Sequence, residues 1–346
     1  MSSRAVNLLI LALLLLELAS GLGSFLVGRP EGAWVFWLHG IGGLSLVVLL
    51  IWKWRIVMRS FARRGAGPWS IAPGALGVLF LGTLATGIWW AVVGRGSLPV
   101  PFYGDMRPLV LHAILAFLLV PPFALHAALR WPRVRHTDFT SRRALLRLLA
   151  VGAGGFVLWR GLAVASTVSA GPERRFTGSR EEASFEGNAH PVTNWLGDRR
   201  QRIAADAWRL EVRGAVSEPY ALGYRELGEL PQQTLRATLD CTGGWYTRQD
   251  WSGVPLSSLL ARAGVSGEAR SVRAVSATGY SRRFGLAEAE GILLATHVGG
   301  DRLSQGHGFP VRLVAPGRRG YHWVKWVERI EVSERPAWWQ PPLPLQ

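Results

Sequence analysis

The chain has 346 residues and a formal net charge of +16, from 39 basic and 23 acidic residues. Only two of the basic residues are lysines, and many of the arginines lie in two short stretches between long apolar runs. This placement favours orientation in a bilayer over nucleic-acid binding, for which the sequence holds no recognised module. The single cysteine, Cys241, excludes an internal disulfide.

Long apolar runs fill the first half of the chain. Four of them are long enough to cross about 30 Å of hydrocarbon as helices. A fifth run is weaker because Arg147 and Arg160 interrupt it. The runs cover residues 6–27, 34–52, 71–93, 109–129 and 144–165. We therefore expect a transmembrane all-α helical bundle of about five helices, with a four-helix membrane domain over residues 1–140.

The connecting segments predict the topology. Segments 53–64 and 130–143 are strongly basic, whereas the other two are nearly neutral. The basic residues are Lys53, Arg55, Arg59, Arg63 and Arg64 in one segment, and Arg130, Arg133, Arg135, Arg142 and Arg143 in the other. By the positive-inside rule the amino terminus is cytoplasmic and everything after the fifth run is outside. We expect a multi-pass protein of the bacterial cytoplasmic (inner) membrane with an extracytoplasmic C-terminal domain.

The fifth run begins with an arginine pair, Arg142 and Arg143, ahead of a modest apolar stretch. This resembles a twin-arginine export signal, although two ordinary inside-flanking arginines would look the same. Twin-arginine export moves folded proteins, as a domain loaded with a cofactor in the cytoplasm would require. We interpret residues 141–169 as a fifth helix that serves as an uncleaved signal anchor.

Two histidines, His39 and His112, lie at similar depth in the second and fourth runs. Ionisable groups in membrane helices are costly and therefore candidates for function. Two neutral imidazoles from neighbouring helices suit the axial positions of a haem iron. The glycines that follow His39, at positions 40, 42 and 43, would leave room for a flat macrocycle. Hydrogen bonding across helices is the alternative role for the pair.

His126 follows His112 by 14 residues on nearly the same helix face. The spacing resembles that of two-haem helices in membrane cytochromes b. The partner histidine expected near position 53 is absent, so one haem b is expected and a second, at His126, is doubtful. Glu17 in the first run either lines a proton or quinone path or faces a polar gap.

The pattern changes after residue 170, where short alternating stretches are separated by glycine, proline and charge. Strands are predicted over residues 208–212, 234–239, 271–276, 292–296 and 311–314, and short helices over 255–263 and 285–290. This second part, residues 170–346, is therefore a mixed α+β domain.

Four blocks of this second part appear in a characteristic order. The stretch from Thr234 ends in Asp240-Cys241-Thr-Gly-Gly and is followed by Trp251-Ser-Gly-Val-Pro-Leu and a leucine-rich stretch. Gly306-His307-Gly-Phe-Pro-Val-Arg312 and Gly320-Tyr-His322-Trp-Val-Lys325-Trp come next. Together they resemble the molybdopterin-dependent oxidoreductases of the sulfite oxidase superfamily. The resemblance implies that Cys241 ligates molybdenum.

The residue chemistry agrees with a molybdenum-molybdopterin cofactor. A thiolate is a soft ligand for a redox metal. Arg312, Lys325 and the loop that ends at Gly320 offer charge and backbone donors for the pterin phosphate, and His307 can hydrogen-bond a pterin edge. The resemblance adds three further cofactor-binding candidates, which are Asn188, His190 and His322.

Two residues are candidates for catalysis beside Cys241. Tyr246 follows Trp245 where sulfite oxidases of animals and plants have an arginine, and this aromatic mouth argues against sulfite as the substrate. Arg283, beside Arg282, lies where the family often has substrate-side residues, although the pair could equally be solvated. The family's immunoglobulin-like dimerisation domain is missing, as in bacterial methionine sulfoxide reductase catalytic subunits.

These patterns predict a membrane-bound molybdenum oxidoreductase, with oxygen-atom transfer on a small-molecule substrate. Electrons would pass through haem b to or from the quinone pool or a membrane electron carrier. The alternative is a haem b transmembrane electron carrier with a non-catalytic binding domain. The lipid bilayer is a further predicted partner, and no nucleic acid is expected to bind.

Overall fold

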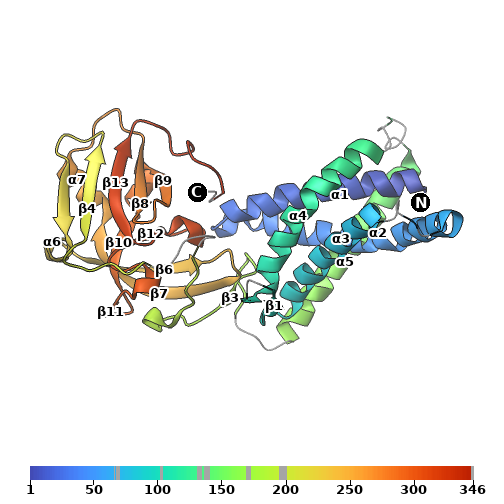
Figure 1. Ribbon diagram of the computed structural model, residues 1–346, viewed down its shortest axis with the longest axis horizontal. Helices are drawn as coiled ribbons and strands as arrows, with labels where there is room; N and C mark the ends of the chain where they lie inside the picture. The colour runs from blue at the N-terminus through green and yellow to red at the C-terminus, as the bar shows by residue number, and fades with distance from the viewer. Residues whose placement is uncertain are drawn as a thin grey trace. The chain divides into compact units, whose positions relative to one another are not determined.

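The computed structural model describes residues 1–65, 67, 71–101, 104–130, 135, 141–168, 173–194 and 201–343. The chain divides into two compact units, Met1–Arg180 and Glu181–Gln346. The first is helical and the second holds both helices and sheets (Figure 1). The predicted order of a helical part followed by a mixed α+β part is confirmed.

The first unit contains five helices that are long and apolar enough to cross a membrane, judged by length and composition in the described residues. They are α1 (Ser3–Leu26), α2 (Trp34–Arg64), α3 (Ile71–Val92), α4 (Pro108–Arg130) and α5 (Arg142–Val168). Within the unit α1 packs on α2, α3 on α4 and α5 on α2. The turn η1 (Pro30–Gly32) and the hairpin of β1 (Leu98–Val100) and β2 (Gly104–Met106) lie in the connections.

Helix α2 corrects one boundary. Segment 53–64, expected to be a basic loop, continues the helix to Arg64, and Gly65 ends it with a positive φ of 68°. Lysine and arginine are good helix formers, so the end of the hydrocarbon run does not end the helix. Lys53 Nζ donates to Asn7 Oδ1 of α1 at 2.9 Å. Most of the second basic segment, Arg133 included, lies outside the described residues.

The second unit contains two sheets. One has the order β11-β10-β7-β3, with β6 also paired to β7 and β12 to β10; the other has the order β5-β4-β13-β8-β9. Strands β13 and β4 form a parallel pair. The strands are β3 (Arg180–Glu181), β4 (Arg209–Gly214), β5 (Tyr220–Gly223), β6 (Gln233–Asp240), β7 (Trp245–Pro255), β8 (Ser271–Ser276), β9 (Ser281–Gly285), β10 (Leu293–Val298), β11 (Asp301–Arg302), β12 (Arg312–Val314) and β13 (Val327–Ser333).

Short helices connect these strands. They are α6 (Tyr224–Glu229), α7 (Leu256–Ala263) and α8 (Leu286–Ala289), with single turns η4 (Gly187–Ala189), η5 (Gln305–His307) and η6 (Gly320–His322). Helix α7 shows how sequence dictates burial: Leu256, Leu259, Leu260 and Ala263 recur at helical spacing and are all buried. Gly264 then ends the helix in the left-handed conformation.

The core of the second unit forms where inward side chains of the strands meet. In β4 the buried residues Leu210 and Val212 alternate with exposed ones, whereas β10 is buried along nearly its whole length. Strand β10 lies between neighbours in its sheet, which explains its continuous apolar run. Trp251 of β7 is fully buried. The long strand β7 and the strand β13 were not among the predicted strands.

Gly253 allows β7 to pass close to β10. A Cβ placed there would lie 2.0 Å from the Leu294 carbonyl oxygen and 2.6 Å from Ala295 Cα. The backbones of β7 and β10 cannot move apart here without breaking the hydrogen bonds that pair the two strands. We expect Gly253→Ala to lower the free energy of unfolding of this unit by about 2 kcal/mol or more. Denaturant unfolding followed by near-ultraviolet circular dichroism measures this. The control Gly267→Ala, where no atom lies within 4 Å, should unfold like the wild type.

Candidate functional site

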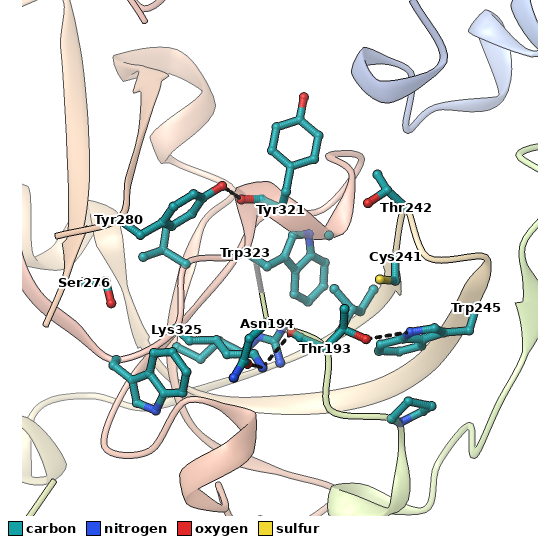
Figure 2. A pocket seen from close by; sticks show the side chains of 16 residues that line it. Thr193, Asn194, Cys241, Thr242, Trp245, Ser276, Tyr280, Tyr321, Trp323 and Lys325 are labelled. Carbon is teal, nitrogen blue, oxygen red and sulfur yellow. Dashed lines mark hydrogen bonds between the residues drawn. The ribbon is translucent and has the colours of Figure 1, made fainter. Parts of the chain in front are cut away.

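A cavity opens in the second unit where the ends of β6 and β7 meet η6 and the segment before β13. Its volume is about 690 Å³, the open mouth included. Figure 2 shows Cys241, Thr242 and Trp245 on one side and Tyr280, Tyr321 and Trp323 on another. The residues that line it are Pro191, Thr193, Asn194, Leu239, Cys241, Thr242, Trp245, Ser276, Tyr280, Arg312, Gly320, Tyr321, Trp323, Val324, Lys325 and Trp326.

Cys241 lies in the turn that joins β6 to β7. Its backbone N–H donates to the Trp245 carbonyl at 2.9 Å, and its Sγ accepts from the Gly243 N–H at 3.3 Å. Burial raises the pKa of the Cys241 thiol, although the Gly243 N–H and the Arg319 charge act in the opposite direction. A bound metal cation would reverse this balance, because a coordinated thiol loses its proton. The thiol is therefore suited to a metal rather than to free nucleophilic chemistry.

A buried ion pair holds this turn in place. Arg319 Nη1 lies 2.7 Å from Asp240 Oδ1, and both side chains are at most 4% exposed. Arg319 also donates to the Cys241 carbonyl at 3.4 Å. The next residue, Gly320, packs against Cys241, since a Cβ there would lie 3.1 Å from Cys241 Cα. Arg319 was not predicted as a site residue, although its place before Gly320 in the fourth sequence block was a signal.

Arg312 brings a positive charge to the inner wall of the cavity. Its side chain is 3% exposed, and its guanidinium lies over the rings of Trp251 and Trp323. Nη1 donates to the His307 carbonyl at 3.3 Å, and Nε is buried without a hydrogen-bond partner in the described part of the chain. Burial lowers the pKa of Arg312 to about 10, and the neighbouring Cys241 sulfur opposes this shift. The guanidinium is therefore still charged at neutral pH.

Gly308 makes the close packing of Arg312 and Lys325 possible. Its φ is +109°, and a Cβ there would lie 3.1 Å from Arg312 Cβ and 3.2 Å from Lys325 Cβ. Lys325 Nζ donates to three protein oxygens: Thr193 O at 3.0 Å, Asn194 Oδ1 at 2.8 Å and Gly306 O at 2.7 Å. Lys325 thus lines the cavity as expected, but its ammonium also links the segment of Thr193 and Asn194 to Gly306.

The rings of His190 and His307 lie against each other with centroids 4.1 Å apart and planes tilted by 53°. His190 Nδ1 lies 2.7 Å from the Gly187 carbonyl and must donate to it, so its Nε2 carries the lone pair. That Nε2 is buried without a partner among the described residues. His307 has the opposite arrangement, with Nε2 2.8 Å from the His190 carbonyl and Nδ1 2.7 Å from Ser304 Oγ. Burial is the main cause that lowers the pKa of His190 to about 3.

Half of the predicted cofactor ligands line the cavity. The lining residues are Cys241, Arg312, Gly320 and Lys325, whereas Asn188, His190, His307 and His322 are not among them. Asn188 ties η4 to the segment after β11, donating to the Arg302 carbonyl and accepting from the Ser304 N–H. His322 is buried against Tyr321 and Phe284, and burial lowers its pKa to about 3.

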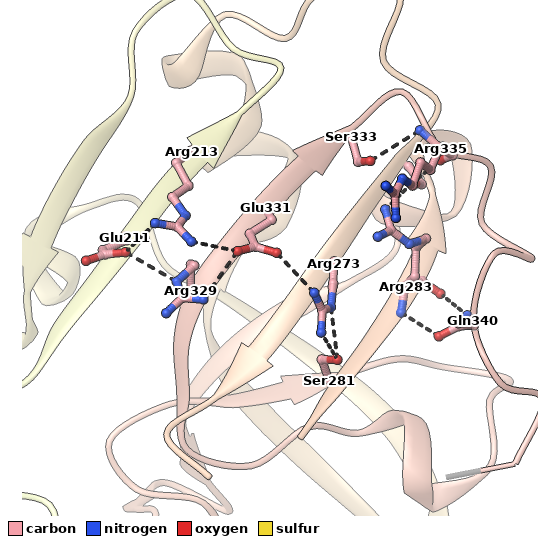
Figure 3. Close-up of polar contacts among 11 residues, drawn as sticks. Glu211, Arg213, Arg273, Ser281, Arg283, Arg329, Glu331, Ser333, Arg335 and Gln340 are labelled. Atoms are coloured by element: carbon pink, nitrogen blue, oxygen red, sulfur yellow. Dashed lines mark hydrogen bonds and ion pairs between the residues drawn. The ribbon is translucent and has the colours of Figure 1, made fainter. Parts of the chain in front are cut away.

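The two further catalytic candidates are not brought into the cavity. Tyr246 is buried next to the lining residue Trp245, and neighbouring strand residues point to opposite faces. Arg283 lies on β9 in a polar network on the second sheet (Figure 3), where it donates to Ser271 Oγ at 2.9 Å. Its backbone N–H donates to Gln340 Oε1 at 2.9 Å. The neighbouring Arg282 donates to the carbonyls of Pro341 and Pro342.

Several lining residues were not predicted, notably Thr193, Asn194 and Tyr280. Tyr280 donates to the Tyr321 carbonyl at 2.5 Å, and Thr193 accepts from the Trp245 indole at 3.1 Å. Nothing in their sequence context marks them, because they come from segments far from the Cys241 block. Trp323 and Trp326 stood in the fourth block but were not assigned a role.

The cavity fits a metal that brings most of its own ligands. No group of three or more His, Cys, Asp or Glu side chains that could hold a metal ion occurs among the described residues. Cys241 would thus supply a single thiolate, and an anionic cofactor would have to provide further donors. Arg312 offers a cation to such a cofactor. His190 is not itself a lining residue; its ring lies 6.0 Å from that of the lining residue Trp245.

In the first unit the two predicted haem ligands come together. The rings of His39 and His112 have centroids 5.9 Å apart and planes at 85°. His112 Nδ1 lies 2.8 Å from the Thr83 carbonyl, and His39 Nδ1 lies 3.1 Å from both Ser20 Oγ and Glu17 Oε2. These oxygens keep the protons on Nδ1, which leaves both Nε2 atoms as potential metal ligands.

Glycines of α3 and α1 allow the His112 and His39 rings to pack closely against these two helices. A Cβ at Gly87 would lie 2.9 Å from His112 Nδ1, and one at Gly21 would lie 3.3 Å from His39 Cε1. The glycines after His39 do not leave open room, however. Gly40 faces the Trp159 ring, whereas Gly42 and Gly43 face the Glu17 carboxylate. His126 lies further along α4 and is half-buried.

The second unit contains a sequence match to a known protein family. Residues 197–339 match the family model of the oxidoreductase molybdopterin binding domain. A nitrate reductase [NADH] of Nicotiana tabacum is 30% identical over 37% of this chain and 18% of its own length. A nitrate reductase [NADPH] of Mycosarcoma maydis is 32% identical over 40% of this chain and 18% of its own length. The chain thus spans less than a fifth of these relatives.

Among solved structures, the sulfane dehydrogenase SoxCD from Paracoccus pantotrophus matches with 30% identity and a TM-score of 0.38. The match covers 39% of this chain and 40% of that chain.

Two buried, neutral histidines, His190 and His322, predict how the free energy of unfolding depends on pH. Their pKa of about 3 in the folded chain lies below the ordinary histidine value of 6.5, so the unfolded chain binds protons first. Stability is complete above pH 6.5 and falls as the pH drops towards 3, by about 1.4 kcal/mol per pH unit for each histidine. Chemical denaturation between pH 7 and pH 4 should show this slope, and His190→Gln should reduce it. A variant with the wild-type slope would contradict this role of His190.

Proposed function

We propose that this chain, which carries an oxidoreductase molybdopterin-binding domain, is a membrane-anchored molybdenum oxidoreductase that transfers an oxygen atom to or from a small molecule. The observation that carries the proposal is the meeting of the Cys241 thiol and the buried Arg312 guanidinium in one cavity. A cation buried without a carboxylate in the described part of the chain favours an anionic ligand.

Two residues that line the cavity and one that lies beside its wall would divide the binding of a molybdenum–pterin group between them. Cys241 would hold the metal, Arg312 would neutralise negative charge of the cofactor, and His190 Nε2 would accept a hydrogen bond from a pterin N–H. Gly308 and Gly320 keep the backbone close enough for these side chains to converge. When bound, the molybdenum group supplies a two-electron centre for oxygen-atom transfer.

The cavity wall favours an uncharged substrate. Aromatic side chains dominate it, with Trp245, Tyr280 and Tyr321 prominent. The Lys325 ammonium is held by three protein oxygens, and Arg312 lies deep beneath two indoles. With these contacts in the described part of the chain, neither Lys325 nor Arg312 is placed to bind an oxyanion at the mouth of the cavity. We infer a neutral oxygen donor or acceptor.

The first unit would supply the electrons. His39 and His112 project from α2 and α4 with their Nδ1 atoms already engaged, as is common for metal-bound imidazoles. We infer that they are the axial ligands of one haem b, with a second haem at His126 doubtful. This haem would exchange single electrons with the quinone pool or another membrane electron carrier.

The five apolar helices would anchor the chain in the bacterial inner membrane. Because basic residues cluster in segments 53–64 and 130–143, we infer a cytoplasmic amino terminus and an extracytoplasmic second unit. The Arg142–Arg143 pair would then serve a twin-arginine signal anchor.

The first test concerns the metal. Protein purified in detergent should contain molybdenum, and Cys241→Ala should lose it because no other described residue can replace the thiolate. Elemental analysis by mass spectrometry measures the metal, and the haem spectrum should persist. The control Arg225→Gln removes a fully exposed arginine and should retain the metal. Wild-type protein without molybdenum but with haem would favour an electron carrier with a non-catalytic domain.

The second test concerns the haem. We expect a reduced-minus-oxidised spectrum of the b type from the wild type. His39→Ala and His112→Ala should each abolish or strongly alter it, because each removes one axial nitrogen. His126→Ala should leave it unchanged if a single haem is bound. A normal spectrum in His39→Ala would overturn the assignment.

A further inference from the structure

Glu17 lies within the 24-residue apolar helix α1, where a carboxylate is costly. Its side chain is 15% exposed, and Oε2 lies 3.1 Å from His39 Nδ1 of α2. The other oxygen, Oε1, is buried without a hydrogen-bond partner in the described part of the chain. The carboxylate is therefore held beside one particular imidazole nitrogen.

Helix α2 is shaped to receive this carboxylate. A Cβ at Gly42 would lie 2.2 Å from Glu17 Oε1, and one at Gly43 would lie 3.4 Å from Oε2. Any larger residue at position 42 would push the carboxylate away from His39. The Ser20 hydroxyl, which donates to the Leu16 carbonyl at 2.7 Å, leaves its oxygen as a second acceptor for the same Nδ1–H. Both neighbours of Nδ1 thus favour the same tautomer.

The second histidine has a different neighbour. His112 Nδ1 lies 2.8 Å from the Thr83 carbonyl, a neutral acceptor. The two rings are 5.9 Å apart, so they form a pair in which only one member faces a carboxylate. A carboxylate beside a ligand histidine raises the basicity of the ligand and fixes its orientation.

We propose that Glu17 is a positioning residue for the haem ligand His39: its Oε2 accepts a hydrogen bond from His39 Nδ1 and so keeps His39 Nε2 directed to the iron. This inference rests on the haem assignment made under the proposed function. A hydrogen-bond partner on the second ring nitrogen fixes the orientation of a ligand imidazole. Removing the acceptor oxygen should therefore alter the spectrum of the ferric haem, whereas a side chain that keeps the oxygen should preserve it.

The experiment compares the electron paramagnetic resonance g-values of the ferric haem in variants of the full chain in detergent. Glu17→Leu removes the acceptor oxygen and should change the g-values, because the His39 ring loses a partner that fixes its orientation. Glu17→Gln has nearly the same shape and keeps an acceptor oxygen, so it should retain the wild-type g-values. Glu31→Leu removes an exposed carboxylate of the same unit and should also leave them unchanged.

A second variant keeps the inference testable if Glu17→Leu does not assemble. Glu17→Asp draws the carboxyl group back from Nδ1, so the g-values of its ferric haem should also differ from those of the wild type. Unchanged g-values in the variant that assembles, with haem bound, would overturn the role of Glu17 alone. Wild-type protein without haem would instead overturn the haem assignment.

Discussion

Arg312 carries a positive charge into the interior of the second unit, and no carboxylate in the described part of the chain pairs with it. Removing a charge from water costs several kcal/mol even after relaxation. The His307 carbonyl and the faces of two indoles offset only part of that cost. The chain retains this cation by packing Gly308 against it and directing it towards Cys241. An anionic ligand would stabilise the folded unit by binding there.

Hydropathy and motif spacing predict much of this fold because burial leaves a direct trace in the sequence. The five apolar runs became α1 to α5, and the molybdopterin-binding domain is confirmed by the match over residues 197–339. Hydropathy did not reveal that α2 continues through its basic segment, because the helix is stabilised by local hydrogen bonds whatever its surroundings. Strand β13 was missed although its buried residues alternate with charged ones, a pattern that is typical of a strand.

The sequence predicted the centre of the candidate site better than its rim. The fold brings several of the sequence blocks together around one cavity. The lining residues that these blocks contribute include Cys241, Arg312, Gly320 and Lys325. Side-chain direction could not be predicted in the same way. Tyr246 neighbours Trp245 in sequence but alternates to the other face, and Lys325 gives its three protons to protein oxygens.

The three histidines closest to the two proposed cofactors share one arrangement. His190, His39 and His112 each have Nδ1 within 3.1 Å of an oxygen, so the Nε2 of each neutral ring carries the lone pair. For His190 this nitrogen is buried without a partner among the described residues, which costs about 1–3 kcal/mol until something donates to it. A hydrogen-bond donor on a ligand would offset that cost. Each imidazole is thus oriented before its ligand binds, so binding need not include the cost of ordering the ring.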